Sequence, residues 1–126
     1  MGDHPAGLGP DLLRGHLDGL LLAVLAEHPA HGYAVIDTLR DRSQGAFELA
    51  EGTVYPALHR LERDGLLSSR WSAEPGRPRR VYALTRSGSR ALSGHRGTWR
   101  SFSHAVERVL GEGVDGGGRV MGEVVR

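Results

Sequence analysis

The sequence predicts a mainly α-helical domain that carries one small β-hairpin. Three segments in the first half of the chain have apolar residues at three- and four-residue spacing, which is typical of helices with one buried face. Two β-rich segments follow at residues 66–74 and 79–85, and a Pro-Gly-Arg-Pro turn separates them. A long helical segment comes last. The predicted order is therefore three helices, a hairpin and a final helix.

Length and composition are those of one globular domain with a modest core. The chain has 126 residues, of which 39% are hydrophobic and 25% charged. It has no cysteine, which excludes disulfides and thiolate metal sites and fits a reducing cytoplasm. The longest apolar run, at residues 20–26, is far shorter than the roughly 20 residues of a membrane span, and residues 1–10 do not read as a signal peptide. We therefore expect a cytoplasmic protein with no membrane partner.

The first predicted helix follows a Gly/Pro-rich lead-in at residues 1–10 and covers residues 11–28, where Pro29 ends it. Its apolar residues share one face: Leu13, Leu17, Leu20, Leu21, Val24 and Leu25. A second helix is expected at residues 32–40. Its predicted buried side consists of Tyr33, Ile36 and Leu39 or Val35. In the connector at residues 46–50, two side chains are expected to fill the core, namely Phe47 and Leu49.

The third predicted helix starts near Gly52 or Thr53 and ends at Asp64-Gly65. One face is apolar and consists of Val54, Ala57, Leu58, Leu61 and Gly65. The opposite face consists of Tyr55, Pro56, His59, Arg60 and Arg63. Proline fits the first turn, where N–H groups have no intrahelical acceptor. A helix of this kind can lie in a major groove about 12 Å wide and read base edges. An ordinary amphipathic surface helix is the alternative.

The hairpin carries the positive charge that the third helix lacks. Residues 70–80 contain four arginines and one glutamate, whereas residues 51–64 contain two arginines and three acidic residues. Three arginines lie at or beside the tip: Arg77, Arg79 and Arg80. A protruding basic tip suits contact with phosphates or entry into a minor groove, although a solvated loop is the alternative. Helix and hairpin together predict a winged helix-turn-helix whose helix supplies specificity and whose wing supplies most of the electrostatic affinity.

The last predicted helix begins after Thr85, a suitable N-cap, and runs to about Gly111. Six residues form a heptad seam: Leu92, His95, Trp99, Phe102, Val106 and Val109. The bulk of the tryptophan and phenylalanine favours a two-fold dimer interface, and packing against the first helix is an alternative that can hold at the same time. The predicted organisation is a flexible lead-in at 1–10, a winged helix-turn-helix at 11–86, a dimerisation helix at 87–110 and a flexible Gly-rich tail at 111–126.

Neither a metal site nor enzyme chemistry is predicted. The seven histidines have no cysteine beside them, and a His-Glu-x-x-His spacing is missing from the sequence. A Gly-rich phosphate loop and a Gly-x-Ser-x-Gly elbow are missing as well. We therefore expect a protein without catalytic residues, metal or cofactor.

Residues 51–66 read Glu-Gly-Thr-Val-Tyr-Pro-Ala-Leu-His-Arg-Leu-Glu-Arg-Asp-Gly-Leu, which is a highly specific motif. Weaker motifs are Leu-Leu-Leu-Ala-Val-Leu at 20–25, Pro-Ala-His-Gly-Tyr at 29–33, Arg-Arg-Val-Tyr-Ala-Leu-Thr-Arg-Ser-Gly at 79–88, and Trp99. Together they resemble the PadR family of bacterial transcriptional regulators. The resemblance spans about residues 12–110, and the single C-terminal helix is similar to that of the short subfamily.

This resemblance implies a homodimer, held by the first and last helices, that binds a palindromic operator commonly built on ATGT and ACAT half-sites and usually represses transcription. It implies that nine residues lie at or near DNA: Tyr33, Thr53, Tyr55, Pro56, His59, Arg60, Arg77, Arg79 and Arg80. Arg63 joins this set as part of the polar helix face. The dimer interface or effector pocket is expected to include the heptad seam together with Leu13 and Leu17.

The resemblance also implies a small aromatic or hydrophobic effector bound between protomers. Trp99 would then be either part of the dimer core or a platform for a flat aromatic ligand. Two other classes of function stay open. One is a ligand- or protein-binding module that has lost operator binding, and the other is a transcriptional activator or an architectural DNA-binding protein.

Overall fold

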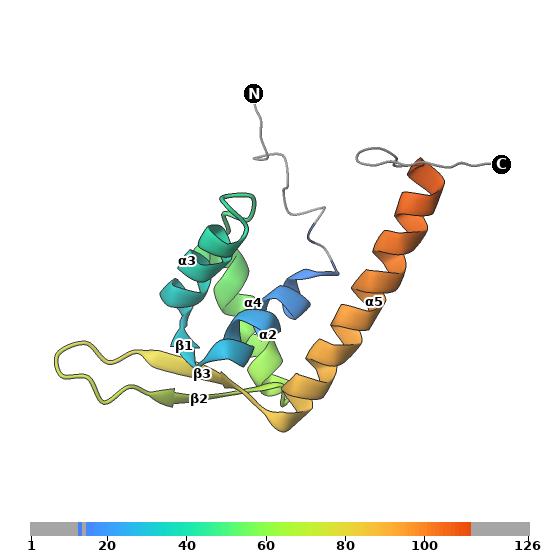
Figure 1. The fold of residues 1–126 in the computed structure, drawn as a ribbon. Coiled ribbons are helices and arrows are strands. Elements are labelled where there is room, and N and C mark those ends of the chain that lie inside the picture. Colours follow the sequence, from blue (N-terminus) through green and yellow to red (C-terminus); the bar gives the residue numbers. More distant parts are fainter. Residues whose placement is uncertain (1–12, 14, 112–126) are drawn as a thin grey trace. The chain divides into compact units, whose positions relative to one another are not determined.

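A computed structural model describes residue 13 and residues 15–111 of the chain (Figure 1). The elements are α2 (Leu17–Glu27), β1 (Ala30–His31), α3 (Gly32–Arg42), α4 (Glu51–Arg63), β2 (Leu67–Trp71), β3 (Arg80–Leu84) and α5 (Arg86–Leu110). Within the described residues this confirms the predicted class of fold, with four helices and a small antiparallel sheet. The expectations for the lead-in, for the start of the first helix and for the tail beyond residue 111 lie outside the described residues. The chain divides into two compact units between His95 and Arg96.

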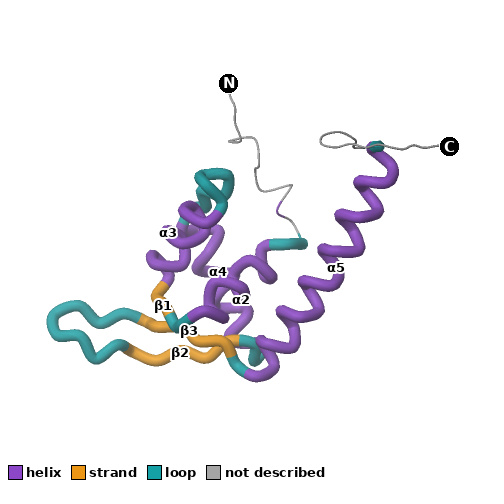
Figure 2. The backbone as a smooth tube through the Cα atoms, viewed as in Figure 1, coloured by secondary structure: helices purple, strands orange, loops and turns teal. Residues whose placement is uncertain are grey.

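The sheet has three strands in the order β1-β3-β2, all antiparallel (Figure 2). Strands β2 and β3 pair from Leu67 opposite Leu84 to Trp71 opposite Arg80, which confirms the predicted hairpin. Strand β1 was not predicted, because two residues are too short for a period-two pattern. It forms only where Ala30 and His31 pair with β3. The connecting loop at residues 72–79 projects beyond the helices of the first unit and forms the tip of the wing (Figure 1).

The core of the first unit lies between α2, α3, α4 and the sheet. Its fully buried large side chains are Leu21, Leu22, Leu58, Leu61, Leu67, Val35, Val54 and Tyr82. Leu92, near the start of α5, also belongs to this cluster. Burial of a leucine-sized side chain contributes about 1.5–3 kcal/mol, so this cluster fixes the positions of α3 and α4 relative to the wing.

The first predicted helix is interrupted, because Gly15 has a φ of +87° and a right-handed helix cannot pass through that conformation. Helix α2 therefore starts at Leu17, and Leu13 is buried outside it. The assignment of Tyr33 to the buried side of the second helix was wrong, since this side chain is 54% exposed. The other predicted positions are correct in part, since Val35 and Leu39, four residues apart, are both buried.

The ends of α4 and α5 follow local sequence signals. Gly65, with a φ of +81°, ends α4, and the amide N–H of Leu66 donates to the carbonyl oxygen of Leu61 at 2.9 Å, as in a Schellman motif. Thr85 caps α5 as predicted, since its hydroxyl oxygen accepts from the amide N–H of Gly88 at 3.0 Å. The reason given for Pro56 was wrong. Helix α4 starts at Glu51, so this proline lies beyond the first turn and removes an intrahelical hydrogen bond.

Candidate nucleic-acid interface

Helices α3 and α4 form a helix-turn-helix whose second helix has one buried and one accessible face. Val54, Ala57, Leu58 and Leu61 are buried, as the apolar spacing predicted. The other predicted apolar position, Gly65, is exposed at the end of the helix. On the accessible face, the exposed residues are Thr53, Pro56, His59 and Arg63, and Tyr55 is half-buried. This face offers hydroxyl, imidazole and guanidinium groups, which can hydrogen-bond to base edges and phosphates.

Two tyrosines meet where α3 and α4 begin. Their rings, Tyr33 and Tyr55, have centroids 6.1 Å apart with an interplanar angle of 79°, an edge-to-face contact. The Tyr55 ring lies directly over Gly32, where a Cβ atom would be 2.6 Å from its hydroxyl oxygen. A hydrogen bond to the Glu51 carboxylate raises the pKa of the Tyr33 phenol, so this hydroxyl is a donor at neutral pH. The result is a rigid aromatic pair with one exposed ring.

The wing reaches the same region through Arg79. One of its guanidinium nitrogens lies 2.6 Å from Nε2 of His31, the residue before α3. The guanidinium can only donate, so the imidazole accepts at Nε2 and carries its proton on Nδ1. With its proton on Nδ1, the imidazole cannot accept from the amide N–H of Ala34, which lies 3.4 Å away, so His31 does not cap α3 in this tautomer. Burial and the Arg79 charge both lower the pKa of His31. At neutral pH the wing base is therefore tied to α3 by a neutral histidine.

The wing also carries accessible charge at its tip. Arg77 is exposed in the loop at residues 72–79, and its charge acts on the Tyr33 phenol. Arg79 likewise acts on the Tyr55 phenol. These electrostatic effects link the predicted wing residues to the aromatic pair. The structure thus brings the starts of α3 and α4 and the basic wing together.

Two arginines that were predicted to contact DNA form contacts with other side chains of the chain. Arg60 forms a bidentate pair with Asp18 of α2, at 2.8 and 2.9 Å, and this hydrogen bonding lowers the pKa of Asp18. Arg80 donates from Nε to the Ser69 hydroxyl at 2.8 Å and lies over the Trp71 ring at 5.3 Å. Neither partner could be predicted from spacing along one helix or strand, because Asp18 lies 42 residues before Arg60 and the partners of Arg80 lie on the other strand.

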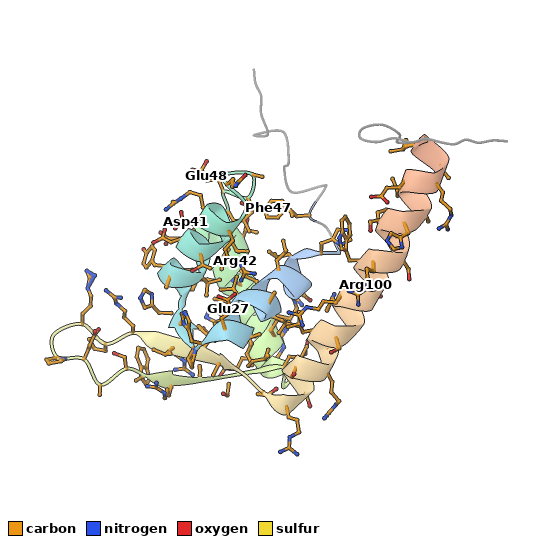
Figure 3. The ribbon with its side chains drawn as sticks, viewed as in Figure 1. Glu27, Asp41, Arg42, Phe47, Glu48 and Arg100 are labelled. Atoms are coloured by element: carbon orange, nitrogen blue, oxygen red, sulfur yellow. The ribbon has the colours of Figure 1, made fainter. Side chains whose placement is uncertain are left out.

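A second ion pair between helices lies at the C-terminal ends of α2 and α3. Arg42 of α3 contacts Glu27 of α2 at 2.8 Å (Figure 3). In the connector that follows α3, Leu49 packs against the core as predicted, whereas Phe47 is half-buried. This ion pair and the bidentate pair at Asp18 hold both helices of the helix-turn-helix to α2, so the orientation of α4 is defined by packing and by charge together.

The predicted seam of α5 divides between the two units. In the first unit, Leu92 is buried, and His95 packs so closely on α2 that a Cβ atom at Gly19 would lie 3.0 Å from the Cβ of His95. Packing within the chain, the alternative interpretation of the seam, therefore applies to this part. In the second unit the rings of Trp99 and Phe102 are 6.0 Å apart and are 51% and 53% exposed. The remaining predicted interface residues are Leu17 and Val106, both half-buried, and Val109, which is exposed.

In the part of the chain that the structure describes, no three histidine or acidic side chains are grouped so that they could hold a metal ion. No helix in this part combines the length and apolarity needed to cross a membrane.

Comparison with known proteins gives one consistent result. A family model described as the transcriptional regulator PadR-like family matches residues 21–94. A transcriptional regulator of Mycobacterium tuberculosis is 40% identical over 86 residues, which cover 68% of this chain and 75% of that protein. Among solved structures, a PadR family transcriptional regulator from Eggerthella lenta has a TM-score of 0.71 and 35% identity, covering 79% of this chain and 86% of its own. A transcriptional regulator from Clostridium thermocellum has a TM-score of 0.74 and 25% identity, covering 79% and 97%.

Proposed function

Because this chain belongs to the PadR-like family of transcriptional regulators, we propose that it is a sequence-specific DNA-binding repressor that acts as a homodimer and is released from its operator by a small molecule. The observation that carries the proposal is the meeting of three features in one region: the accessible face of α4, the tyrosine pair, and the basic wing at Arg77 and Arg79. A polar helix face beside a basic hairpin is the arrangement with which winged-helix proteins engage duplex DNA.

In this proposal α4 enters a major groove and the wing contacts the flanking backbone. Its contact residues are Tyr33, Thr53, Tyr55, Pro56, His59 and Arg63 on the helices and Arg77 and Arg79 on the wing. The helices supply hydrogen-bonding groups but little net positive charge, so they contribute specificity. The arginines of the wing contribute affinity that does not depend on sequence. The ion pair with Asp18 holds α4 against α2. Because Arg60 is engaged in this pair, we leave it out of the proposed DNA contacts.

The dimer rests on the distal part of α5. Two large aromatic side chains, Trp99 and Phe102, are half-exposed on one helix, and aromatic side chains on an accessible surface are typical of protein–protein interfaces. A two-fold dimer would set two α4 helices about 34 Å apart, which is one turn of DNA. An aromatic or hydrophobic effector between protomers would favour an arrangement with a different spacing and release the DNA by population shift. Such a protein needs no catalytic residue, cofactor or metal.

A footprint on the DNA upstream of the chain's own gene, with and without cell extract, tests the function directly. Two symmetric protected half-sites whose protection is lost with extract would support operator binding and effector release. If that region and random genomic fragments give no protection, the chain is a ligand- or protein-binding module instead. Transcription of the neighbouring gene after deletion separates repressor from activator, since loss of a repressor raises it.

A salt titration tests the wing. Replacing Arg77 and Arg79 together by alanine should weaken binding to every duplex and reduce the slope of log K against log salt by roughly 1.8, because two phosphate contacts are lost. Arg90→Ala is the matched control, since this arginine is exposed on α5 and donates to the Ser87 hydroxyl of the same helix. An unchanged slope for the double variant would refute the wing assignment.

A further inference from the structure

Three side chains from three elements meet where the wing leaves the core. The hydroxyl of Ser69 on β2 donates to Oε2 of Glu62 on α4 at 2.6 Å, and it accepts from Nε of Arg80 on β3 at 2.8 Å. A guanidinium nitrogen of Arg80 lies 3.8 Å from the same carboxylate oxygen. Its Cζ atom is 5.3 Å from the centroid of the Trp71 ring, a cation–π contact. We call Glu62, Ser69 and Arg80 the wing brace.

The direction of both hydrogen bonds of the Ser69 hydroxyl is fixed. Arg80 is a donor only and the ionised Glu62 is an acceptor only, so the single proton of Ser69 must point to the carboxylate while its lone pair faces the guanidinium. Both hydrogen bonds involve a charged partner and are therefore stronger than neutral ones. The Glu62 side chain is 30% exposed and that of Arg80 is 44% exposed, so solvent screens the pair only in part.

The brace lies where the sheet needs support. Strand β1 pairs with β3 only opposite Val81 and Tyr82, so beyond this point the wing is a two-stranded ribbon with an eight-residue tip at 72–79. A two-stranded ribbon is marginally stable alone. Ser69 and Trp71 are two residues apart on β2 and share a face with Leu67, which is buried. Along this face the hydrophobic core ends and the wing brace begins.

We propose that Glu62 and Ser69 are positioning residues that fix the angle between α4 and the wing. Arg80 supports this angle through its contacts with them and does not contact a phosphate. This inference rests on the proposed DNA binding for its functional consequence, but its structural part can be tested without DNA. In this proposal the electrostatic attraction of the wing for DNA comes from Arg77 and Arg79, because the charge of Arg80 is already offset by the Glu62 carboxylate.

The direction in which one substitution changes DNA affinity distinguishes this proposal from a simple effect of charge. Removing an acidic group beside DNA normally strengthens binding to a polyanion. If Glu62 instead holds the wing in place, Glu62→Ala should weaken binding to a 30-base-pair duplex by about tenfold or more, as expected when one good contact region is misplaced. Asp64→Asn is the matched control, because this exposed acid ends the same helix outside the brace; it should bind equally well or more tightly. Stronger binding by Glu62→Ala would overturn the proposal.

The salt dependence of binding, and the additivity of binding losses in a double variant, test whether Arg80 supports the wing brace or contacts a phosphate. Arg80→Ala should weaken binding while leaving the salt slope near that of the wild type, whereas Arg77→Ala should lower the slope by about 0.9. Arg80→Lys keeps the charge but cannot donate along the same fork, so it should bind as weakly as the alanine variant. The double variant with Glu62→Ala should be no weaker than Arg80→Ala alone. A lowered slope for Arg80→Ala, rescue by lysine, or additive losses would show a direct phosphate contact.

A measurement without DNA keeps the brace distinct from the proposed function. The chain has two tryptophans, so labelling with 5-fluorotryptophan gives two ¹⁹F resonances, assigned with Trp71→Phe. Glu62→Ala and Ser69→Ala should shift the Trp71 resonance, because Arg80 leaves its ring, and should leave the Trp99 resonance unmoved. An unmoved Trp71 resonance would overturn the brace. If the wild type binds no duplex while this resonance shifts, the brace stands and DNA binding fails.

Discussion

Replacing Gly32 by alanine should displace the Tyr55 ring from the candidate interface with little effect on stability. A Cβ atom at this position would lie 2.5 Å from Cε1 and 2.6 Å from the hydroxyl oxygen of Tyr55. Favourable contacts between heavy atoms begin near 3.5 Å, so the ring must retreat by roughly 1 Å. The ring is the movable partner, because Gly32 is held by the start of α3 and by its position next to β1. The substitution therefore acts on recognition through Tyr55.

The stability terms nearly cancel. Loss of the edge-to-face contact between Tyr55 and Tyr33 costs about 0.5–1.5 kcal/mol. Alanine in place of glycine in a helix gains about 0.5–1 kcal/mol, because the unfolded chain has less entropy to lose. We therefore expect a free energy of unfolding within about 1 kcal/mol of the wild type. Affinity for the upstream DNA should fall by roughly 5- to 150-fold, because a shift of about 1 Å breaks the proposed base-edge hydrogen bond of Tyr55, which is worth about 1–3 kcal/mol.

Urea unfolding and fluorescence anisotropy with the upstream duplex measure the two quantities on the same samples. Gly94→Ala is the matched control, because among the described residues nothing outside the neighbouring helix backbone lies within 4 Å of a Cβ added to this glycine of α5. It should stabilise the protein by about 0.5–1 kcal/mol and leave binding unchanged. In a Tyr55→Ala background, Gly32→Ala should also become stabilising. If Gly32→Ala in the wild-type background stabilises as Gly94→Ala does and binds DNA normally, the ring is not held over Gly32 and the reasoning fails.

Three further substitutions test an ion pair, a close backbone contact and the proposed dimer. Asp18→Asn should destabilise the protein by about 1 kcal/mol at pH 7, because a hydrogen bond from Arg60 lowers the pKa of Asp18 in the folded state. This stabilisation is present above the usual pKa of 3.8 and is lost as pH falls through the lower folded value, so urea unfolding should show a smaller difference from the wild type at pH 3 than at pH 7. An equal difference at both pH values would contradict this reasoning. Gly88→Ala should destabilise strongly, by more than about 2 kcal/mol in urea, since its Cβ would overlap the backbone carbonyl of Leu66, and a fully stable variant would refute this. Trp99→Ala should shift the protein toward monomer in sedimentation velocity, whereas a retained dimer would favour the ligand-platform role.

Much of this fold follows from local patterns. The apolar spacing of α4 predicted which of its faces is buried, because a helical period relates neighbours within one element. Thr85 and Gly65 were predicted as a cap and a stop for the same reason, since each acts on amides or carbonyls within a few residues. The charge contrast between α4 and the wing was also visible in the sequence. These features determine the class of fold and the family to which the chain belongs.

The interaction partners of the long arginine side chains could be identified only from the tertiary structure. Arg60 and Arg80 lie at positions predicted to contact DNA, and the structure shows that Arg60 pairs with Asp18 of α2 whereas Arg80 belongs to the wing brace. An arginine side chain has several rotatable bonds and extends far from its own backbone, so its position on a helix or strand does not define its partner. Two further features depend on segments that are distant in the sequence. Strand β1 forms by pairing with β3, and the Tyr55 ring packs on Gly32 of another helix. The sequence by itself predicted the helix-turn-helix and its wing, and the packing of distant elements determined which arginines of these elements are paired within the protein.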